Sequence, residues 1–165
     1  MFPENSNPLD SQAKKEEAIK AVGEALDETT PEFRLKLAVQ FINKGFGEAV
    51  FAHLDKFLES ERSELVVECI NKGFGEVVFE HLDKFPEPER VKIAEILATV
   101  GYAKNVFGIL FSSFEGRNRY VLAEALIEAG LYKEISGVID RFPKEERAAL
   151  GLRILDEAKT IRHQN

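Results

Sequence analysis

Apolar residues recur along the chain three and four positions apart, and these groups themselves recur about every 28 residues. Counted from each of five evenly spaced arginines, the residues three, four, seven and eight positions later are nearly all apolar. The first of these columns contains Leu37, Leu65, Ile93, Leu122 and Leu150. Spacings of three and four place side chains on one face of a helix, whereas a half-buried strand would alternate. The pattern therefore predicts a series of helices, each with one apolar face.

Three kinds of landmark share the same period. The arginines are Arg34, Arg62, Arg90, Arg119 and Arg147; the glycines are Gly45, Gly73, Gly101 and Gly130; the phenylalanines are Phe57, Phe85, Phe114 and Phe142. Successive members are 28 or 29 residues apart, and the one extra residue lies between Gly101 and Phe114. Residues 42–57 return at 70–85 with two changes. A period of about 20–50 residues indicates stacked supersecondary units.

Each unit is predicted to hold two antiparallel helices, because a glycine ends the first helix and a second apolar pattern follows it. The second helices are predicted over Phe46–Phe57, Phe74–Phe85, Tyr102–Phe114 and Leu131–Phe142. We predict an all-α fold, a right-handed α-solenoid of stacked antiparallel helix pairs with a 28-residue repeat. Residues 1–10 are predicted to be a disordered tail, followed by a single helical-repeat domain over 11–161. Within it we place a capping helix (11–27), four repeats (30–57, 58–85, 86–114 and 115–142) and a C-terminal capping helix (144–161).

One stretch carries a likeness to a known class. Residues 123–132 read AEALIEAGLY, and short helix pairs of this composition resemble the tetratricopeptide-like superhelical repeat proteins. The resemblance extends from about residue 30 onward, although the period is shorter than the 34 residues typical of that family and the chain has no tryptophan. It implies that the first helices of the pairs line a concave surface.

Composition narrows the functional classes. With 44% hydrophobic and 31% charged residues the chain can build a packed core. The formal net charge of -7 repels phosphate backbones. No run approaches the roughly 20 apolar residues of a membrane helix and no signal peptide is recognisable, so we expect a cytoplasmic protein without a membrane partner. Cys69 is the only cysteine and falls in an apolar column, which predicts a buried, inert side chain.

The regular polar residues are interpreted as structural. An ion pair is predicted between each arginine and an aspartate seven residues earlier, which gives Arg62–Asp55, Arg90–Asp83 and Arg147–Asp140; Ser112 replaces the aspartate before Arg119. His53 and His81 occupy equivalent positions, but equivalent atoms of stacked repeats lie about 10 Å apart, too far to share zinc. We find no catalytic grouping of residues. We therefore predict that the chain is not an enzyme and has no cofactor or metal site.

The outer face of the first helices is the candidate site. A polar row on this face, flanked by lysines and aliphatic residues, can hydrogen-bond an extended peptide and bury its side chains. A solvated face would equally require polar residues. The predicted partner-binding residues are Asn43, Asn71, Thr99, Glu128, Lys36, Lys92, Val39, Val67 and Ile96.

The predicted function is a protein–protein interaction scaffold or adaptor that binds a peptide or helix in a concave groove. The alternative is a repeat-type single-stranded nucleic-acid binding protein, with Lys56, Lys84 and Arg141 as a partial basic row. Ser113 interrupts that row, and the net charge argues against nucleic acid. An enzyme built on stacked helices would need an acidic residue in a basic cleft. The near-identity of the first two repeats also permits self-association.

Overall fold

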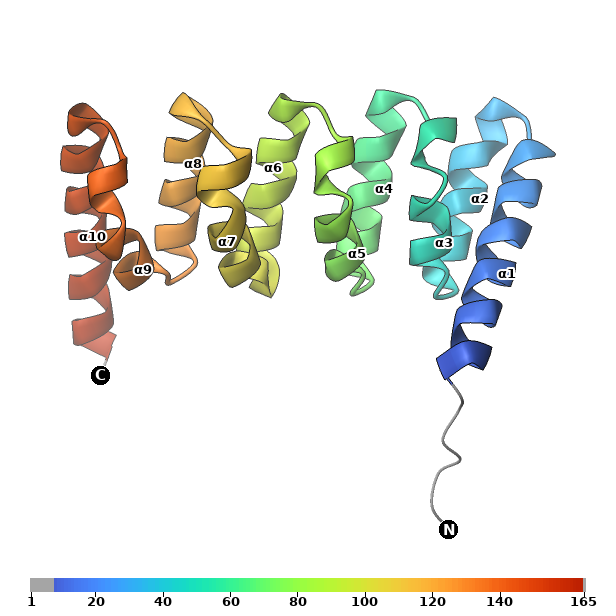
Figure 1. Cartoon of the computed structure of the whole chain (residues 1–165), viewed down its shortest axis with the longest axis horizontal. Coiled ribbons are helices and arrows are strands. Elements are labelled where there is room, and N and C mark those ends of the chain that lie inside the picture. The colour runs from blue at the N-terminus through green and yellow to red at the C-terminus, as the bar shows by residue number, and fades with distance from the viewer. Residues whose placement is uncertain (1–7, 165) are drawn as a thin grey trace, which may run out of the picture. The chain divides into compact units, whose positions relative to one another are not determined.

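The computed structural model describes residues 8–164, and side chains over 12–160. Within residues 8–164 it contains helices and turns but no strand, so the all-α prediction is confirmed (Figure 1). Most of the predicted tail, residues 1–7, lies outside the described residues. Residues 8–10, also predicted to belong to the tail, form the first turn of the first helix, which begins at Pro8.

The chain divides into two compact units, the first ending at His81 and the second beginning at Leu82. Unit 1 contains α1 (Pro8–Asp27), α2 (Pro31–Asn43), α3 (Gly47–Phe51), η1 (Leu54–Lys56), α4 (Glu59–Asn71) and α5 (Gly75–Glu80). Unit 2 contains η2 (Leu82–Lys84), α6 (Glu87–Leu97), η3 (Ala98–Tyr102), α7 (Ala103–Ser113), α8 (Gly116–Glu128), α9 (Tyr132–Gly137), η4 (Ile139–Arg141) and α10 (Lys144–Gln164).

Each unit has two layers of helices. In unit 1, α2 and α4 lie side by side, and α3 contacts both α1 and α5 in the second layer (Figure 1). In unit 2, α8 lies between α6 and α10, and α7 and α9 pack against them. Each amphipathic helix thus buries its apolar face against helices of both layers, which a short helix cannot do alone.

Glycines end the first helix of each pair, as predicted. Gly45, Gly73, Gly101 and Gly130 all have positive φ, between 86° and 107°. After α2 the Phe46 N–H donates to the Phe41 carbonyl at 2.9 Å, and the Gly45 N–H donates to the Ile42 carbonyl at 3.0 Å. The same pair of bonds follows α4 and α8. This is a Schellman motif, in which a left-handed residue allows the chain to reverse.

The second helices are shorter than predicted. One helix was predicted over Phe46–Phe57, but α3 ends at Phe51 and is followed by a 3-10 turn, η1. The helix predicted over Leu131–Phe142 is likewise divided into α9 and η4. Only α7 is continuous, and it contains the extra residue of the period. An α-helix rises about 1.5 Å per residue and a 3-10 helix about 2.0 Å. A continuous α-helix therefore needs one more residue to cover the same length.

The apolar columns form the core with exceptions at the ends. Leu65, Ile93, Leu122 and Leu150 are buried, but Leu37 is only half-buried. On α10 Leu155 is 57% exposed, although the corresponding residues of α2, α4, η3 and α8 (Ile42, Ile70, Ala98 and Ile127) are buried. The reason is that α10 packs mainly against α8, α9 and η4 and is the last of the described helices.

Among the described residues, one helical stretch, Glu87–Ser113, is long and apolar enough to cross a bilayer by length and composition alone. Within it Val100 and Gly101 leave helical φ/ψ, and α6 and α7 fold back against each other. The stretch is therefore a helical hairpin with two arms of 11 residues, shorter than the roughly 20 residues of a spanning helix.

Candidate functional site

A shallow groove lies between α2 and α4 on the outer face of unit 1. Its lining consists of Leu35, Lys36, Val39 and Gln40 from α2 with Glu64 from α4, and its volume is about 420 Å³. The four residues of α2 share one side of the helix, because positions i, i+1, i+4 and i+5 fall within an arc of about 140°. The groove therefore combines an aliphatic floor with an ammonium, an amide and a carboxylate at its edges.

Two of the predicted site residues of unit 1 line this groove, and the other three lie on the same two helices. Lys36 and Val39 line it, and Val67 on α4 is 44% exposed. Asn43 and Asn71 are exposed and form the last residues of α2 and α4. At the other end of α2, Phe33 is 57% exposed and its ring centre lies 5.8 Å from the Lys36 ammonium.

The polar side chains of this face are not used within the protein. Among the described residues, the side chains of Asn43, Asn71, Gln40 and Glu64 make no hydrogen bond or ion pair. All four side chains are exposed, so their donors and acceptors are available to a ligand.

Sequence reasoning missed three lining residues, Leu35, Gln40 and Glu64. Gln40 falls in the same column as the predicted residue Ile96, and Glu64 falls in the same column as Lys36 and Lys92, so the period contained a signal for both. The period contained no such signal for Leu35, because the residues at the same position of α6 and α8, Val91 and Tyr120, are buried.

The predicted site residues of unit 2 have different surroundings. Lys92 is exposed and Ile96 half-buried on α6, while Thr99 in η3 donates its hydroxyl to the Ile96 carbonyl at 2.8 Å. Glu128 on α8 accepts a hydrogen bond from Arg153 of α10 at 2.7 Å.

The α8–α10 face of unit 2 is cross-linked by this arginine. Arg153 Nε also lies 3.2 Å from a Glu124 carboxylate oxygen, which accepts the Tyr120 hydroxyl at 2.9 Å as well. The charge of Glu124 raises the pKa of Arg153, while burial, together with the bond to Glu124, raises the pKa of Tyr120. Carboxylates that could receive a ligand on this face are thus already paired.

The predicted arginine–aspartate pairs are mostly wrong. Within residues 12–160 only Arg147 pairs with its aspartate, Asp140, at 3.5 Å. Three of the arginines, Arg62, Arg119 and Arg147, bind the main-chain carbonyl of the phenylalanine five residues earlier instead. The bonds run from Arg62 Nε to Phe57 O (3.1 Å), from Arg119 Nε and Nη2 to Phe114 O (3.0 and 2.7 Å) and from Arg147 Nε to Phe142 O (2.7 Å). Arg90 lies over the Phe114 ring, 5.9 Å from its centre.

The two equivalent histidines bind different groups. His53 donates from Nε2 to the Ile19 carbonyl at 2.8 Å, and His81 donates from Nδ1 to the Val77 carbonyl at 2.9 Å. The His81 ring also packs edge-on against Phe51, with ring centres 5.8 Å apart. No group of three His, Cys, Asp or Glu side chains that could hold a metal ion occurs among the described residues.

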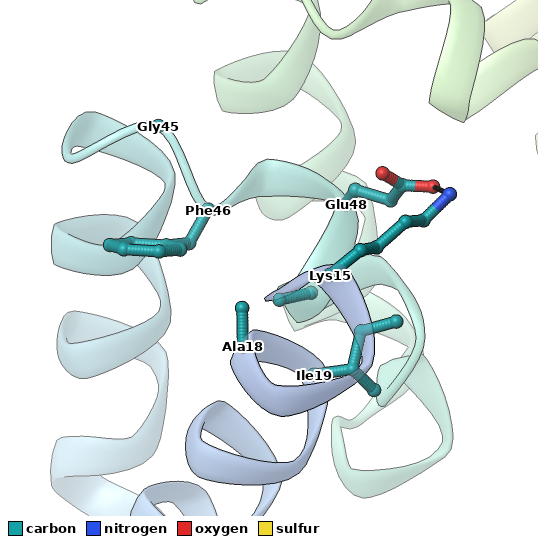
Figure 2. Close-up of a pocket in the computed structure, with 7 residues that line it drawn as sticks. Lys15, Ala18, Ile19, Gly45, Phe46 and Glu48 are labelled. Atoms are coloured by element: carbon teal, nitrogen blue, oxygen red, sulfur yellow. Dashed lines mark ion pairs between the residues drawn. The ribbon is translucent and has the colours of Figure 1, made fainter. Parts of the chain in front are cut away.

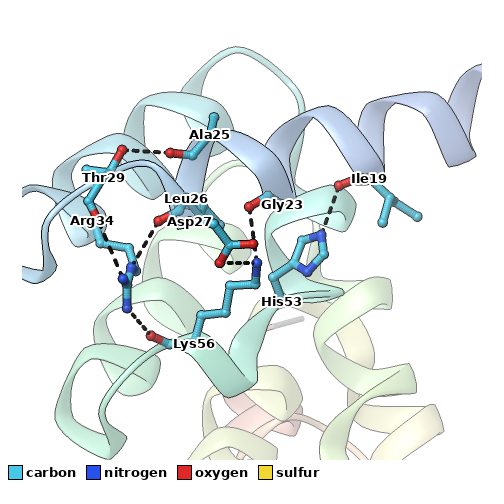
Figure 3. Close-up of polar contacts among 9 residues, drawn as sticks. All are labelled: Ile19, Gly23, Ala25, Leu26, Asp27, Thr29, Arg34, His53 and Lys56. Carbon is cyan, nitrogen blue, oxygen red and sulfur yellow. Dashed lines mark hydrogen bonds and ion pairs between the residues drawn. The ribbon is translucent and has the colours of Figure 1, made fainter.

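His53 belongs to a polar cluster that anchors the C-terminal half of α1 (Figure 3). Lys56 donates to the Gly23 carbonyl at 3.1 Å and pairs with Asp27 at 2.6 Å, and the hydrogen bond from Lys56 lowers the pKa of that carboxyl. Arg34 donates to the carbonyls of Leu26, Thr29 and Lys56. Cations at a helix C-terminus are favourable because the terminal carbonyls carry a partial negative charge.

The basic row of the nucleic-acid alternative is therefore partly used within the protein. Lys56 is engaged by α1 as described above. The Arg141 guanidinium stacks 3.7 Å from the centre of the Phe111 ring. Lys84 is exposed.

A second pocket of unit 1, of about 270 Å³, lies between α1 and the turn before α3 (Figure 2). Lys15 and Glu48 form an ion pair at its rim, and the hydrogen bond to Glu48 raises the pKa of Lys15. Both carboxylate and ammonium are satisfied by each other, so this pocket offers a ligand mainly the apolar surfaces of Ile19 and Phe46.

Comparison of the chain with protein-family models, curated proteins and solved structures found no significant match. Function is therefore argued from the residues of the site itself.

Proposed function

We propose that the chain is a protein–protein interaction scaffold or adaptor, and that the α2–α4 groove binds a peptide or a helix of another protein. The supporting observation is the combination found on one face of unit 1: an aliphatic floor around Val39, exposed Val67 and Phe33, and unpaired amides of Asn43 and Asn71. An apolar groove with a few convergent polar groups is the usual form of a peptide-binding surface.

The proposal includes the arrangement of the helices. The helix pairs, the positive-φ glycines and the arginine–carbonyl bonds recur at the 28-residue spacing of the sequence. We infer a right-handed α-solenoid in which α2, α4, α6, α8 and α10 are the first helices of successive pairs. In such an arrangement the first helices share one surface, and the groove is the part of that surface left open to a ligand.

The geometry suits a ligand that uses both side chains and main chain. Adjacent packed helices are about 8–10 Å apart, and an extended peptide advances about 3.3 Å per residue. The amides of Asn43 and Asn71 are thus about three peptide residues apart, so one side chain between them can enter the aliphatic floor. We place this activity in the cytoplasm and assign the chain no catalytic step.

The test begins with a random peptide library displayed on phage and selected against the whole chain. Selected peptides are then measured by calorimetry against a Val39→Asp/Val67→Asp variant. Burying an uncompensated carboxylate in the interface is expected to weaken binding at least about tenfold. An Ala13→Asp/Ala52→Asp variant, which adds the same charge at exposed positions of α1 and the turn after α3, is the matched control.

Two results would contradict the proposal. One is a selected peptide that binds both variants equally, which would place the ligand elsewhere. The other is a selection that enriches no peptide.

A further inference from the structure

The turn between α7 and α8 in unit 2 differs from the other turns in its charges. Two residues before the closing phenylalanine the chain carries Asp55, Asp83 and Asp140, and one residue before it Lys56, Lys84 and Arg141. In the α7–α8 turn both positions are serine, Ser112 and Ser113. The turn has thus lost an acidic and a basic residue together.

Two guanidinium groups meet at this turn on one aromatic ring. Arg119 lies 5.0 Å and Arg141 lies 3.7 Å from the centre of the Phe111 ring. Neither guanidinium forms an ion pair among the described residues, and Asp140, the carboxylate adjacent to Arg141 in the chain, pairs with Arg147 instead. Two guanidinium groups that contact the same ring, with no carboxylate of the described residues paired to either, favour the approach of an anion.

The donors of this cluster are partly committed and partly available. Arg119 uses Nε and Nη2 on the Phe114 carbonyl, which leaves Nη1. Arg141 is exposed, and its described contact is the face of the ring, which leaves the edge of the guanidinium to solvent. Guanidinium edges bind phosphate oxygens with paired, charge-assisted hydrogen bonds.

We propose that Arg119 and Arg141, held on Phe111, form a site for a phosphate monoester, and that the phosphate is carried by Ser112. A protein kinase would transfer the γ-phosphoryl group of a nucleoside triphosphate to the Ser112 hydroxyl, which gives up its proton as the nucleoside diphosphate leaves. Ser112 is exposed, and its hydroxyl donates only to the Ile109 carbonyl at 3.2 Å and meets Ser113 at 3.5 Å. At the equivalent position Asp140 pairs with Arg147 at 3.5 Å, whereas Asp55 and Asp83 form no ion pair among the described residues. A phosphoserine is longer and more highly charged than an aspartate, so it supplies the missing anion.

The test uses the whole chain with phosphoserine incorporated at position 112 and, as a control, at position 63. Ser63 is exposed on α4 and lies beside Glu59 and Glu64, without an arginine cluster. Phosphorus NMR then follows the second ionisation of each phosphate. We expect the pKa of the phosphate at 112 to lie at least about half a unit below that at 63, because nearby guanidiniums favour the dianion.

The variant that isolates the site is Arg141→Gln, since its ring contact is the only described interaction that is lost. It is expected to raise the pKa of the phosphate at 112 and leave the phosphate at 63 unchanged, with an unaltered circular-dichroism spectrum. Arg119→Gln is less suitable because it also removes the bonds to the Phe114 carbonyl.

A second arm asks whether the phosphate comes from another molecule. Inorganic phosphate is added to the unmodified chain up to about 10 mM, enough to detect dissociation constants in the millimolar range, while the arginine side-chain signals are recorded. If the pKa of the phosphate at position 112 is lowered and inorganic phosphate shows no saturable binding, the site binds the phosphate ester of this chain. Saturable binding that Arg141→Gln abolishes assigns a phosphate supplied by a ligand. Equal ionisation at 112 and 63 together with no binding would overturn the proposal.

Discussion

The ion pairs and side-chain hydrogen bonds that join helices lie in different places in the two units. In unit 1 the ion pairs and side-chain hydrogen bonds of Lys15, Lys56, Arg34 and His53 tie α1 to the rest of the unit, and the outer face of α2 and α4 is left open. In unit 2 Arg153 ties α10 to α8 across the outer face itself. The same layered design thus yields one face whose polar groups are free and one whose α8–α10 part is cross-linked by its own charges.

The prediction with the largest expected effect asks whether the two units differ only at their surfaces or also in their cores. Leu65 of α4 and Leu122 of α8 are both fully buried. Replacing either with alanine should cost about 2–5 kcal/mol of unfolding free energy, because each leaves a cavity. Urea unfolding followed by circular dichroism measures both. A loss under about 1 kcal/mol at one site only would show that the cores differ as well as the faces.

A smaller effect concerns the attachment of α1. A Cβ at Gly23 would lie 2.6 Å from His53 Nε2, so Gly23→Ala must displace the ring that bonds the Ile19 carbonyl. We expect a loss of about 1–3 kcal/mol from steric overlap and the broken hydrogen bond.

Gly108 in α7 provides the matched control in unit 2. It lies in a helix with nothing within 4 Å of an added Cβ, so Gly108→Ala should stabilise the chain by up to about 1 kcal/mol through helix propensity. If both alanine variants shift the unfolding free energy in the same direction, the hydrogen bond between His53 and the Ile19 carbonyl does not require a glycine at position 23.

Arg153→Gln should have a smaller effect again. The side chain is 47% exposed, and exposed ion pairs contribute little and are screened by salt. We expect a slight fall in melting temperature at low salt that disappears at high salt. Lys36→Gln on the open face of unit 1 is the control, since Lys36 forms no ion pair among the described residues. A salt-independent loss for Arg153→Gln would mean that its aliphatic stem, not its charge, holds α10.

The smallest effect is a pH dependence in unit 1. The hydrogen bond from Lys56 lowers the pKa of Asp27 in the folded chain, so this contribution to stability is present above the ordinary carboxyl range and is lost as pH falls through the lowered pKa. Below about pH 4 wild type and Asp27→Asn should therefore converge in melting temperature, with wild type higher near neutrality. Asp55→Asn, which removes a carboxylate without an ion pair in the described structure, should show no such convergence.

The sequence predicted the features that depend on local chemistry. Gly45 and Gly130 marked helix ends because their positive φ suits a residue without a side chain. Leu65 and Leu122 were assigned to the core from helical spacing, and Cys69 is buried as expected, which raises the pKa of its thiol to about 12.

The sequence did not predict two kinds of interaction: contacts between residues far apart in the chain, and hydrogen bonds to main-chain carbonyls. Arg62 was assigned to Asp55, but it binds the Phe57 carbonyl, an acceptor that every residue carries and that no sequence pattern distinguishes. Arg153 reaches Glu124 and Glu128 across 29 and 25 residues, so no local spacing pointed to it. Leu35 entered the groove because its surroundings differ from those of its counterparts in unit 2.

The arginine–carbonyl bonds have an evolutionary consequence. Since the acceptor at Phe57, Phe114 and Phe142 is a peptide oxygen, no point mutation at those positions removes it, and only the arginine has to be kept. A duplicated segment that contains the arginine therefore also contains this hydrogen bond. The outward-facing residues of each copy can then change to suit a new ligand while the arginine–carbonyl bonds are kept.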